Sequence, residues 1–131
     1  MNFSSRHIVI VEDEVALGQI CQELLTTHGY KATFYSTAVQ ALKETENVHI
    51  DLLITDVGLA DKSGYEFVAE LNNRCKLAGQ PEVPVIFISG AFLPQINSGN
   101  SFYLEKPFSI YTLLKQVRTI FDSQEQKQQA G

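Results

Sequence analysis

Three short runs of apolar residues constrain the fold of this 131-residue chain more than any other feature. They cover residues 8–11, 52–55 and 85–88, and each is apolar almost throughout rather than at alternate positions. Such strands are buried on both faces, as in a parallel sheet that lies between two layers of helices. Stretches with helical spacing of apolar residues separate the runs, so strands and helices alternate along the chain. The pattern predicts an α/β domain.

Two weaker strands and several helices complete the pattern. Residues 31–35 mix polar and apolar side chains, as an edge strand does, and residues 102–104 form a short fifth strand. Right-handed crossovers then give a doubly wound sheet of five parallel strands, whose common compact form has the flavodoxin-like order 2-1-3-4-5. We predict helices over about 14–28, after Ser36-Thr37, from Gly64 to Gly79, and after Pro107.

Composition fits one ordinary globular domain. The chain is 44% hydrophobic and 19% charged, and its formal net charge of −5 disfavours direct binding to nucleic acid. Cys21 and Cys75 make no metal-ligand pattern, and reduced thiols fit a cytoplasmic protein. No apolar run is long enough to insert into a membrane or to serve as a secretory signal. We expect the domain to occupy residues 1–121, with 122–131 as a polar tail or the start of a linker.

Chemically useful side chains follow four of the predicted strands. Glu12 and Asp13 follow the first strand, Asp56 the third, Ser89 the fourth and Lys106 the fifth. In the 2-1-3-4-5 order the ligand crevice lies outside the carboxyl ends of strands one and three. We therefore expect these side chains to converge at one edge of the sheet.

Each of these residues also has a plainer explanation. Glu12 and Asp13 could favour the dipole of the helix that follows, Asp56 could order a loop, and Lys106 could be a surface lysine. Three acids in one crevice, however, repel one another unless a cation lies among them, and Mg²⁺ prefers oxygen ligands. An aspartate in such a site can attack a phosphoryl donor and become an aspartyl phosphate. Coincidence at four strand ends is less probable than one site.

With these residues in place, the chain resembles the receiver domain of two-component response regulators from about residue 6 to residue 121. Five segments carry the resemblance in the expected order, namely 8–14, 52–56, 63–66, 84–90 and 103–108. Each segment alone is a weak signal, whereas all five in order are specific.

The resemblance implies a phosphoacceptor and a metal site. Asp56 would accept the phosphoryl group in a reaction that depends on Mg²⁺ or Mn²⁺. Asp13 and Asp56 would bind the metal directly and Glu12 largely through water, and the backbone carbonyl of Gly58 would supply a further ligand. The donor would be a histidine kinase or a histidine phosphotransfer protein, so the domain would not be a conventional enzyme.

The resemblance also implies a conformational switch. Lys106 would hold the phosphoryl group, Ser89 would donate a hydrogen bond to it, and Tyr103 would turn inward once Ser89 has moved. The peptide bond between Lys106 and Pro107 is expected to be cis.

The chain departs from the family pattern in two places. Ala60 stands where the family usually has proline. The segment 90–101 is about one helical turn shorter than usual and contains Pro94 and Gly99, so we predict a short, irregular or absent fourth helix there. The small residues Gly58 and Ala91 should leave water access to the phosphorylated aspartate, from which we expect a short-lived phosphorylated form.

Other functions fit the sequence less well. A phosphatase of the haloacid dehalogenase type needs a second acid where Gly58 stands, and a flavin carrier needs a loop rich in Ser, Thr and Gly where residues 12–14 are acidic. Two readings within the same fold stay open. The chain could be a receiver module cut from a hybrid histidine kinase or longer regulator, or a docking module that is never phosphorylated.

Overall fold

One parallel sheet forms the centre of the computed structural model, which describes residues 6–91 and 99–130. Its strands run in the order β2-β1-β3-β4-β5 and every neighbouring pair is parallel, which confirms the predicted fold class. Their bounds are β1 (His7–Val11), β2 (Lys31–Tyr35), β3 (Leu52–Asp56), β4 (Val85–Ser89) and β5 (Ser101–Glu105).

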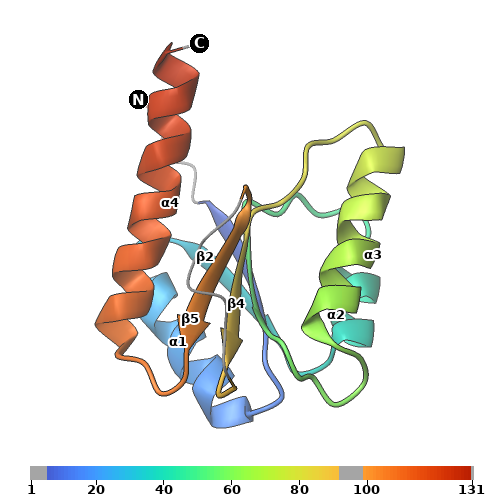
Figure 1. Cartoon of the computed structure of the whole chain (residues 1–131), viewed down its shortest axis with the longest axis vertical. Helices are drawn as coiled ribbons and strands as arrows, with labels where there is room; N and C mark the ends of the chain where they lie inside the picture. Colours follow the sequence, from blue (N-terminus) through green and yellow to red (C-terminus); the bar gives the residue numbers. More distant parts are fainter. Residues whose placement is uncertain (1–5, 92–98, 131) are drawn as a thin grey trace.

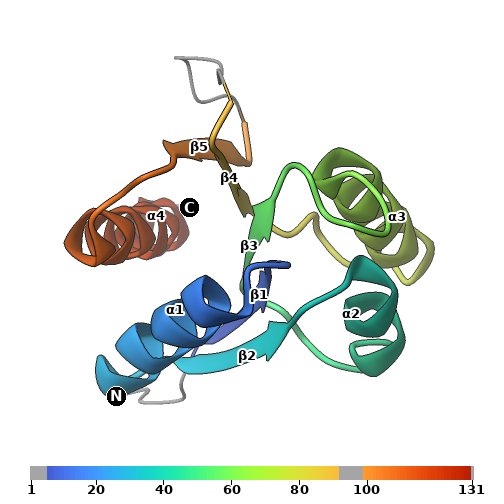
Figure 2. The ribbon, with the colours of Figure 1, turned by 90° about the horizontal axis from the view of Figure 1, so that it is seen from below.

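Helices cover both faces of the sheet (Figure 2). α1 (Val15–Thr27) and α4 (Ile110–Ala130) lie on one face, and α2 (Ala38–Glu44) and α3 (Gly64–Leu77) lie on the other. Within the described parts of the chain, none of these helices is both long and apolar enough to cross a membrane.

The central strands are buried on both faces, as their continuous apolar sequences predict. Along β1, Ile8 and Ile10 pack in the core beneath α1 and α4, whereas Val9 and Val11 pack beneath α2 and α3. Each such side chain contributes about 1.5–3 kcal/mol when it is fully buried. The hydrophobic cores on the two faces of the sheet therefore fix the positions of its strands relative to one another, including their carboxyl ends.

Polar side chains set where two helices begin. Thr37 accepts a hydrogen bond from the amide of Gln40 at the start of α2, and Ser63 accepts one from the amide of Glu66 at the start of α3. Each bond satisfies an amide that has no partner within its helix. Gly29, with φ of +93°, follows the end of α1 in a left-handed conformation that glycine adopts without strain. These local signals agree with the predicted helices.

The segment 122–131, expected to be a polar tail or the start of a linker, is helical as far as Ala130. Its backbone continues α4 to Ala130, beyond the apolar stripe that ends at Phe121 (Figure 1). The segment contains no proline or glycine before Gly131, and most of its residues favour helix. Arg6 also packs 4.5 Å from the ring centre of Phe121 and donates a hydrogen bond of 2.9 Å to Gln124. That the segment starts a linker stays a prediction.

The fourth helix that we predicted to be short, irregular or absent between β4 and β5 would fall mainly on residues 92–98, which lie outside the described residues. The flanking residues 90–91 and 99–100 form bends and turns rather than helix. The prediction for this segment therefore stays a prediction.

Candidate functional site

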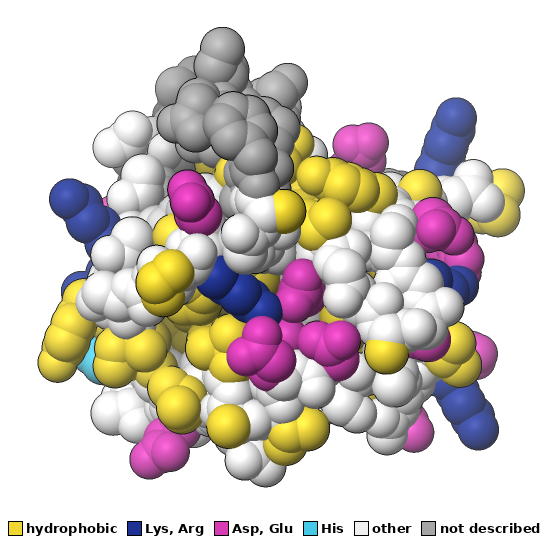
Figure 3. All heavy atoms as spheres, turned by 60° about the horizontal axis from the view of Figure 1, so that its bottom comes forward, with side chains coloured by type: hydrophobic (Ala, Val, Ile, Leu, Met, Phe, Trp, Pro, Cys, Tyr) yellow, Lys and Arg dark blue, Asp and Glu magenta, His cyan; other side chains and the backbone are white. Residues whose placement is uncertain are grey.

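The charged residues that follow separate strands meet at the carboxyl edge of the sheet. Figure 3 shows a basic side chain lying among acidic ones on this face. The Nζ atom of Lys106 lies 2.8 Å from Oδ2 of Asp56 and 2.9 Å from Oε1 of Glu12. It lies 3.0 Å from Oε1 of Glu14 as well. The ammonium group of Lys106, which follows β5, thus contacts acids just after β1 and at the last residue of β3.

Three of the acids have the arrangement of a cation site. Carboxylate oxygens of Glu12, Asp13 and Asp56 all lie within 4.8 Å of one another. The side chain of Glu12 is only 1% exposed; within the described residues its Oε1 has an ion-pair contact of 2.9 Å with Nζ of Lys106 and no assigned hydrogen-bond partner. A buried carboxylate next to two further carboxylates fits a hard divalent cation such as Mg²⁺.

The surroundings shift the pKa values of Glu12 and Asp56 in opposite directions. Burial raises the pKa of Glu12 to about 7, and the amide of Glu14 and the nearby ammonium of Lys106 offset this only in part. Burial also acts to raise the pKa of Asp56, but hydrogen bonds from Lys106 and from the amide of Gly58 outweigh it, so this pKa is lowered. Asp56 is therefore the acid of this pair that stays ionised at neutral pH, as a nucleophile must.

Lys106 is held in its charged form. Burial acts to lower its pKa, but the hydrogen bonds to Asp56 and the contacts with Glu12 and Glu14 raise it above the ordinary value. An ammonium fixed between carboxylates can later offer the same charge to a phosphoryl oxygen.

The loop after β3 is folded tightly against Asp56. The amide of Gly58 donates a hydrogen bond of 2.9 Å to Oδ1 of Asp56, and the amide of Gly64 donates one of 2.7 Å to the carbonyl of Val57. A Cβ atom on Gly64 would lie 2.2 Å from the backbone oxygen of Asp56. Only glycine therefore allows α3 to begin this close to the predicted phosphoacceptor.

Ser89 lies next to the acids and Lys106, and its carbonyl and hydroxyl accept hydrogen bonds from backbone amides. Its carbonyl accepts a 2.8 Å hydrogen bond from the amide of Lys106, which ties the ends of β4 and β5 together. Its buried hydroxyl accepts a 3.0 Å hydrogen bond from the amide of Ala91. The peptide bond between Lys106 and Pro107 is cis.

Tyr103 lies in an aromatic row on the side of the sheet that α2 and α3 cover. Its ring stacks on Phe87 with ring centres 5.7 Å apart, and Phe87 packs on Tyr65 at 4.7 Å. The switch role of Tyr103 stays a prediction. So does the metal-binding role of the Gly58 carbonyl.

Two residues of this region were missed by sequence reasoning. Glu14 contacts Lys106, and its place as the third acid in a run of three after the first strand could have indicated this. Asp61 accepts hydrogen bonds from the amides of Ala38 (3.2 Å) and Val39 (2.8 Å), which ties the loop after β3 to the start of α2. No sequence signal pairs Asp61 with a helix more than twenty residues earlier.

The chain belongs to the response regulator receiver domain family, whose model matches residues 8–118. This confirms the resemblance, and the matched range includes every residue of the cluster described above. The family is that of the receiver domains of two-component signalling.

Curated relatives and solved structures agree with this assignment. The chain is 29% identical over 119 residues to the regulatory protein VirG of Agrobacterium tumefaciens (strain 15955), covering 86% of this chain and 42% of VirG. It is 28% identical over 119 residues to the response regulator SaeR of Staphylococcus aureus (strain USA300), covering 87% of this chain and 50% of SaeR. The chain thus spans half or less of the length of these relatives.

Two receiver structures superpose on most of the chain. The receiver domain of the hybrid histidine kinase CckA is 30% identical with a TM-score of 0.72, covering 86% of this chain and 96% of that one. A CheY-like receiver domain protein from Methanospirillum hungatei JF-1 is 25% identical with a TM-score of 0.76, covering 95% of this chain and 99% of that one.

Proposed function

We propose that the chain is a phosphoacceptor receiver in which Asp56 takes a phosphoryl group from a histidine kinase or a histidine phosphotransfer protein. One observation carries the proposal, namely the contact of Lys106 with Asp56 at 2.8 Å and with the buried Glu12 at 2.9 Å. These residues follow different strands, and a structural ion pair would not need to gather several acids around one lysine.

The chemistry follows from the charges at the site. An oxygen of the Asp56 carboxylate attacks the phosphorus atom, the bond from phosphorus to the donor nitrogen breaks, and an aspartyl phosphate forms. Lys106 stabilises negative charge on the transferred group. A bound Mg²⁺ would supply further positive charge, held by Asp13, Asp56 and the Gly58 carbonyl, with Glu12 acting largely through water.

The phosphorylated aspartate would then bias the conformation of the domain. The Ser89 hydroxyl accepts a hydrogen bond from the Ala91 amide, which leaves its own O–H free to donate to a phosphoryl oxygen. Tyr103 would follow inward, and the aromatic row through Phe87 gives that movement a path toward α3. Such a domain is a two-state element that one covalent change shifts.

Mass spectrometry of the intact protein tests the assignment of Asp56. Incubation with acetyl phosphate and Mg²⁺ should add the mass of one phosphoryl group to the unsubstituted chain and none to Asp56→Asn. Equal addition to both proteins would overturn the role of Asp56.

A thermal unfolding assay tests the metal site without any phosphoryl donor. Mg²⁺ at ten times its dissociation constant should raise the free energy of unfolding by about 1.4 kcal/mol. Asp13→Asn should abolish this rise, because it removes a charged oxygen ligand. Manganese should act in the same way as magnesium, since both prefer oxygen ligands.

We also propose that the phosphorylated form is short-lived. Among the described residues, nothing lies within 4 Å of the position where a Cβ atom of Gly58 would stand, so a small residue here leaves space two positions after Asp56. A phosphorylated form that survives for many hours in buffered Mg²⁺ would contradict this.

A further inference from the structure

Glu14 shares Lys106 with the proposed phosphoacceptor. The Nζ atom donates hydrogen bonds to Oδ2 of Asp56 at 2.8 Å and to Oε1 of Glu14 at 3.0 Å, and it contacts Oε1 of Glu12 at 2.9 Å. An ammonium group has three N–H donors. Three carboxylates therefore already surround the donors that a phosphoryl group would use.

The three carboxylates differ in how easily they can leave the lysine. The side chains of Glu12 and Asp56 are 1% and 11% exposed, whereas that of Glu14 is 65% exposed. Water can replace an exposed ion-pair partner at little cost, while a buried carboxylate that loses its cation is strongly destabilised. Asp56 must also stay in place, since it receives the phosphoryl group. Glu14 is the partner that can give way.

The backbone of Glu14 is fixed while its side chain is not. Its amide donates a 3.0 Å hydrogen bond to Oε2 of Glu12, and the residue occupies the position that caps α1. The Glu14 carboxylate makes no capping hydrogen bond with that helix. Release of Lys106 therefore requires only a rotation of the Glu14 side chain and leaves Glu12 and α1 undisturbed.

We propose that Glu14 is a positioning residue that holds Lys106 in the unphosphorylated protein and competes with the phosphoryl group for it. This inference rests on the proposed function of Asp56. The contact with Glu14 exists before transfer and is absent in the transition state and in the phosphorylated form. Its loss should therefore speed phosphorylation and leave dephosphorylation unchanged, because only the starting state of the first step is affected.

Glu14→Gln tests the proposal, with Glu23→Gln as the matched control. Glu23 is exposed on α1 as well, so both variants remove one negative charge near the same helix. The rate of phosphoryl gain at low acetyl phosphate concentration should rise about two- to fivefold in Glu14→Gln, the range expected for an exposed ion pair. The rate should not change in Glu23→Gln. The rate of dephosphorylation should be the same in all three proteins.

The variant Glu14→Asp tests whether the contact with Lys106, rather than the negative charge alone, slows phosphorylation. The variant keeps the negative charge but shortens the side chain by one methylene group, and aspartate at this position also favours the amides of α1 over Lys106. The phosphorylation rate should rise in the direction seen for Glu14→Gln. If Glu14→Asp is phosphorylated as fast as the unsubstituted protein while Glu14→Gln is phosphorylated faster, the negative charge acts through its long-range electrostatic field. That result would overturn the proposal.

A double-mutant cycle in unfolding gives a readout that needs no phosphorylation. The effects of Glu14→Gln and Lys106→Gln on the unfolding equilibrium of the unphosphorylated protein should be non-additive by about two- to fivefold. Additive effects, an unchanged phosphorylation rate in Glu14→Gln, or equal changes in both rates would each overturn the role of Glu14. If the unsubstituted chain gains no phosphoryl group at all, the proposed function fails, and this inference fails with it.

Discussion

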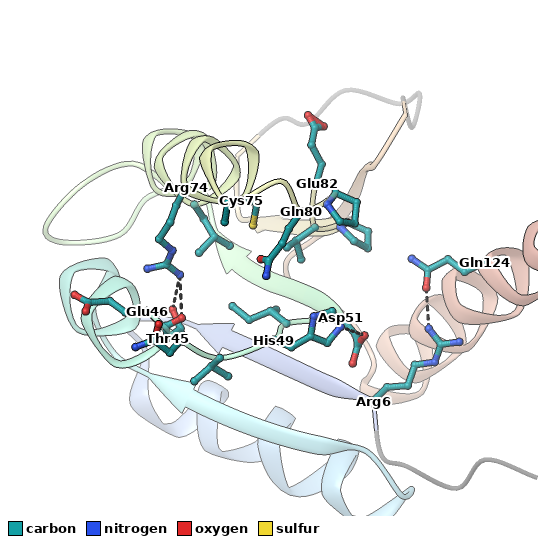
Figure 4. A pocket seen from close by; sticks show the side chains of 18 residues that line it. Arg6, Thr45, Glu46, His49, Asp51, Arg74, Cys75, Gln80, Glu82 and Gln124 are labelled. Carbon is teal, nitrogen blue, oxygen red and sulfur yellow. Dashed lines mark hydrogen bonds and ion pairs between the residues drawn. The ribbon is translucent and has the colours of Figure 1, made fainter.

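Charged residues are arranged differently at the two ends of the parallel strands, which we call the carboxyl edge and the amino edge of the sheet. Like charges crowd together at the carboxyl edge, whereas the charges of Arg74 and Asp51 at the amino edge are paired with complementary groups. At the carboxyl ends of the strands, three acids crowd around Lys106, and the Lys106 ammonium is the described group that Oε1 of the buried Glu12 contacts. At the amino edge, a pocket of about 740 Å³ opens between the segments that precede β3 and β4 and the end of α3 (Figure 4). Charged side chains of this pocket bind groups of the surrounding segments.

At the amino ends of the strands, Arg74 and Asp51 are paired with groups of complementary charge or polarity, mostly from other segments of the chain. Arg74 donates to the carbonyls of Leu42 (2.7 Å) and Thr45 (3.2 Å) and to the Thr45 hydroxyl (2.9 Å). Asp51 accepts from the amide of His7 at 2.7 Å and pairs with His49 at 2.9 Å. The comparison teaches that crowded like charges around one lysine, rather than the presence of a pocket, mark the candidate functional site of this domain.

Removing the lysine at the carboxyl edge should have the largest effect. Lys106→Gln should slow phosphorylation by acetyl phosphate about a hundredfold, because it deletes a charge aimed at the transferred group. The rate of phosphoryl gain measures this by intact mass. A rate within twofold of the unsubstituted protein would remove Lys106 from the site.

A methyl group on Gly64 should disturb the same edge through the backbone. The Cβ of Gly64→Ala would lie 2.2 Å from the carbonyl oxygen of Asp56, so the loop or α3 must shift. We expect the free energy of unfolding to fall by about 1–3 kcal/mol, together with slower phosphorylation. Gly90→Ala is the stability control, because no atom of the residues that the structure describes lies within 4 Å of its Cβ position. Equal stability of the two variants in urea unfolding would contradict the expectation.

Removing the arginine at the amino edge should affect stability but not chemistry. Arg74→Ala loses three hydrogen bonds to the end of α2 and its following turn, and should lower the free energy of unfolding by about 1–3 kcal/mol. Lys76→Ala removes the same charge from an exposed position on α3 and should change stability little. A marked fall in the phosphorylation rate of folded Arg74→Ala would show that the two edges are coupled.

The smallest effect is expected from Asp61, which connects the loop after β3 to α2. Asp61→Asn removes the charge and one acceptor that face two helix amides, and should lower the free energy of unfolding by about 0.5–1 kcal/mol at pH 7. Urea unfolding of both proteins measures the difference.

The Asp61 contribution should depend on pH in a definite direction. Burial acts to raise the pKa of Asp61, but hydrogen bonds from the amides of Val39 and Ala38 outweigh it and lower the pKa below its ordinary value of 3.8. Since the folded protein holds the ionised form more tightly, the contribution is present above pH 3.8 and is lost as pH falls through the lowered value. The difference between Asp61→Asn and the unsubstituted protein should therefore shrink below pH 4. A constant difference down to pH 3 would contradict the assignment.

Most of the fold could be predicted because its signals are local. Continuous apolar runs indicate buried parallel strands whatever their neighbours, and Thr37, Ser63 and Gly29 mark helix ends through their own backbone preferences. The helical course of residues 122–130 was missed, because polar composition indicates exposure but does not by itself exclude helix. Part of its support is Arg6, which contacts Gln124 from 118 residues away in sequence.

The sequence by itself determined which residues could do chemistry, since an acid, a hydroxyl or a lysine after an apolar strand is visible without coordinates. Tertiary structure alone decided which of these residues contact one another. Lys106 contacts Glu14 as well as Asp56, Glu12 is buried beside the same ammonium, and Gly64 lies against the Asp56 carbonyl. The physical reason is that contact, burial and pKa depend on distances between strands, and those distances exist only once both cores have packed.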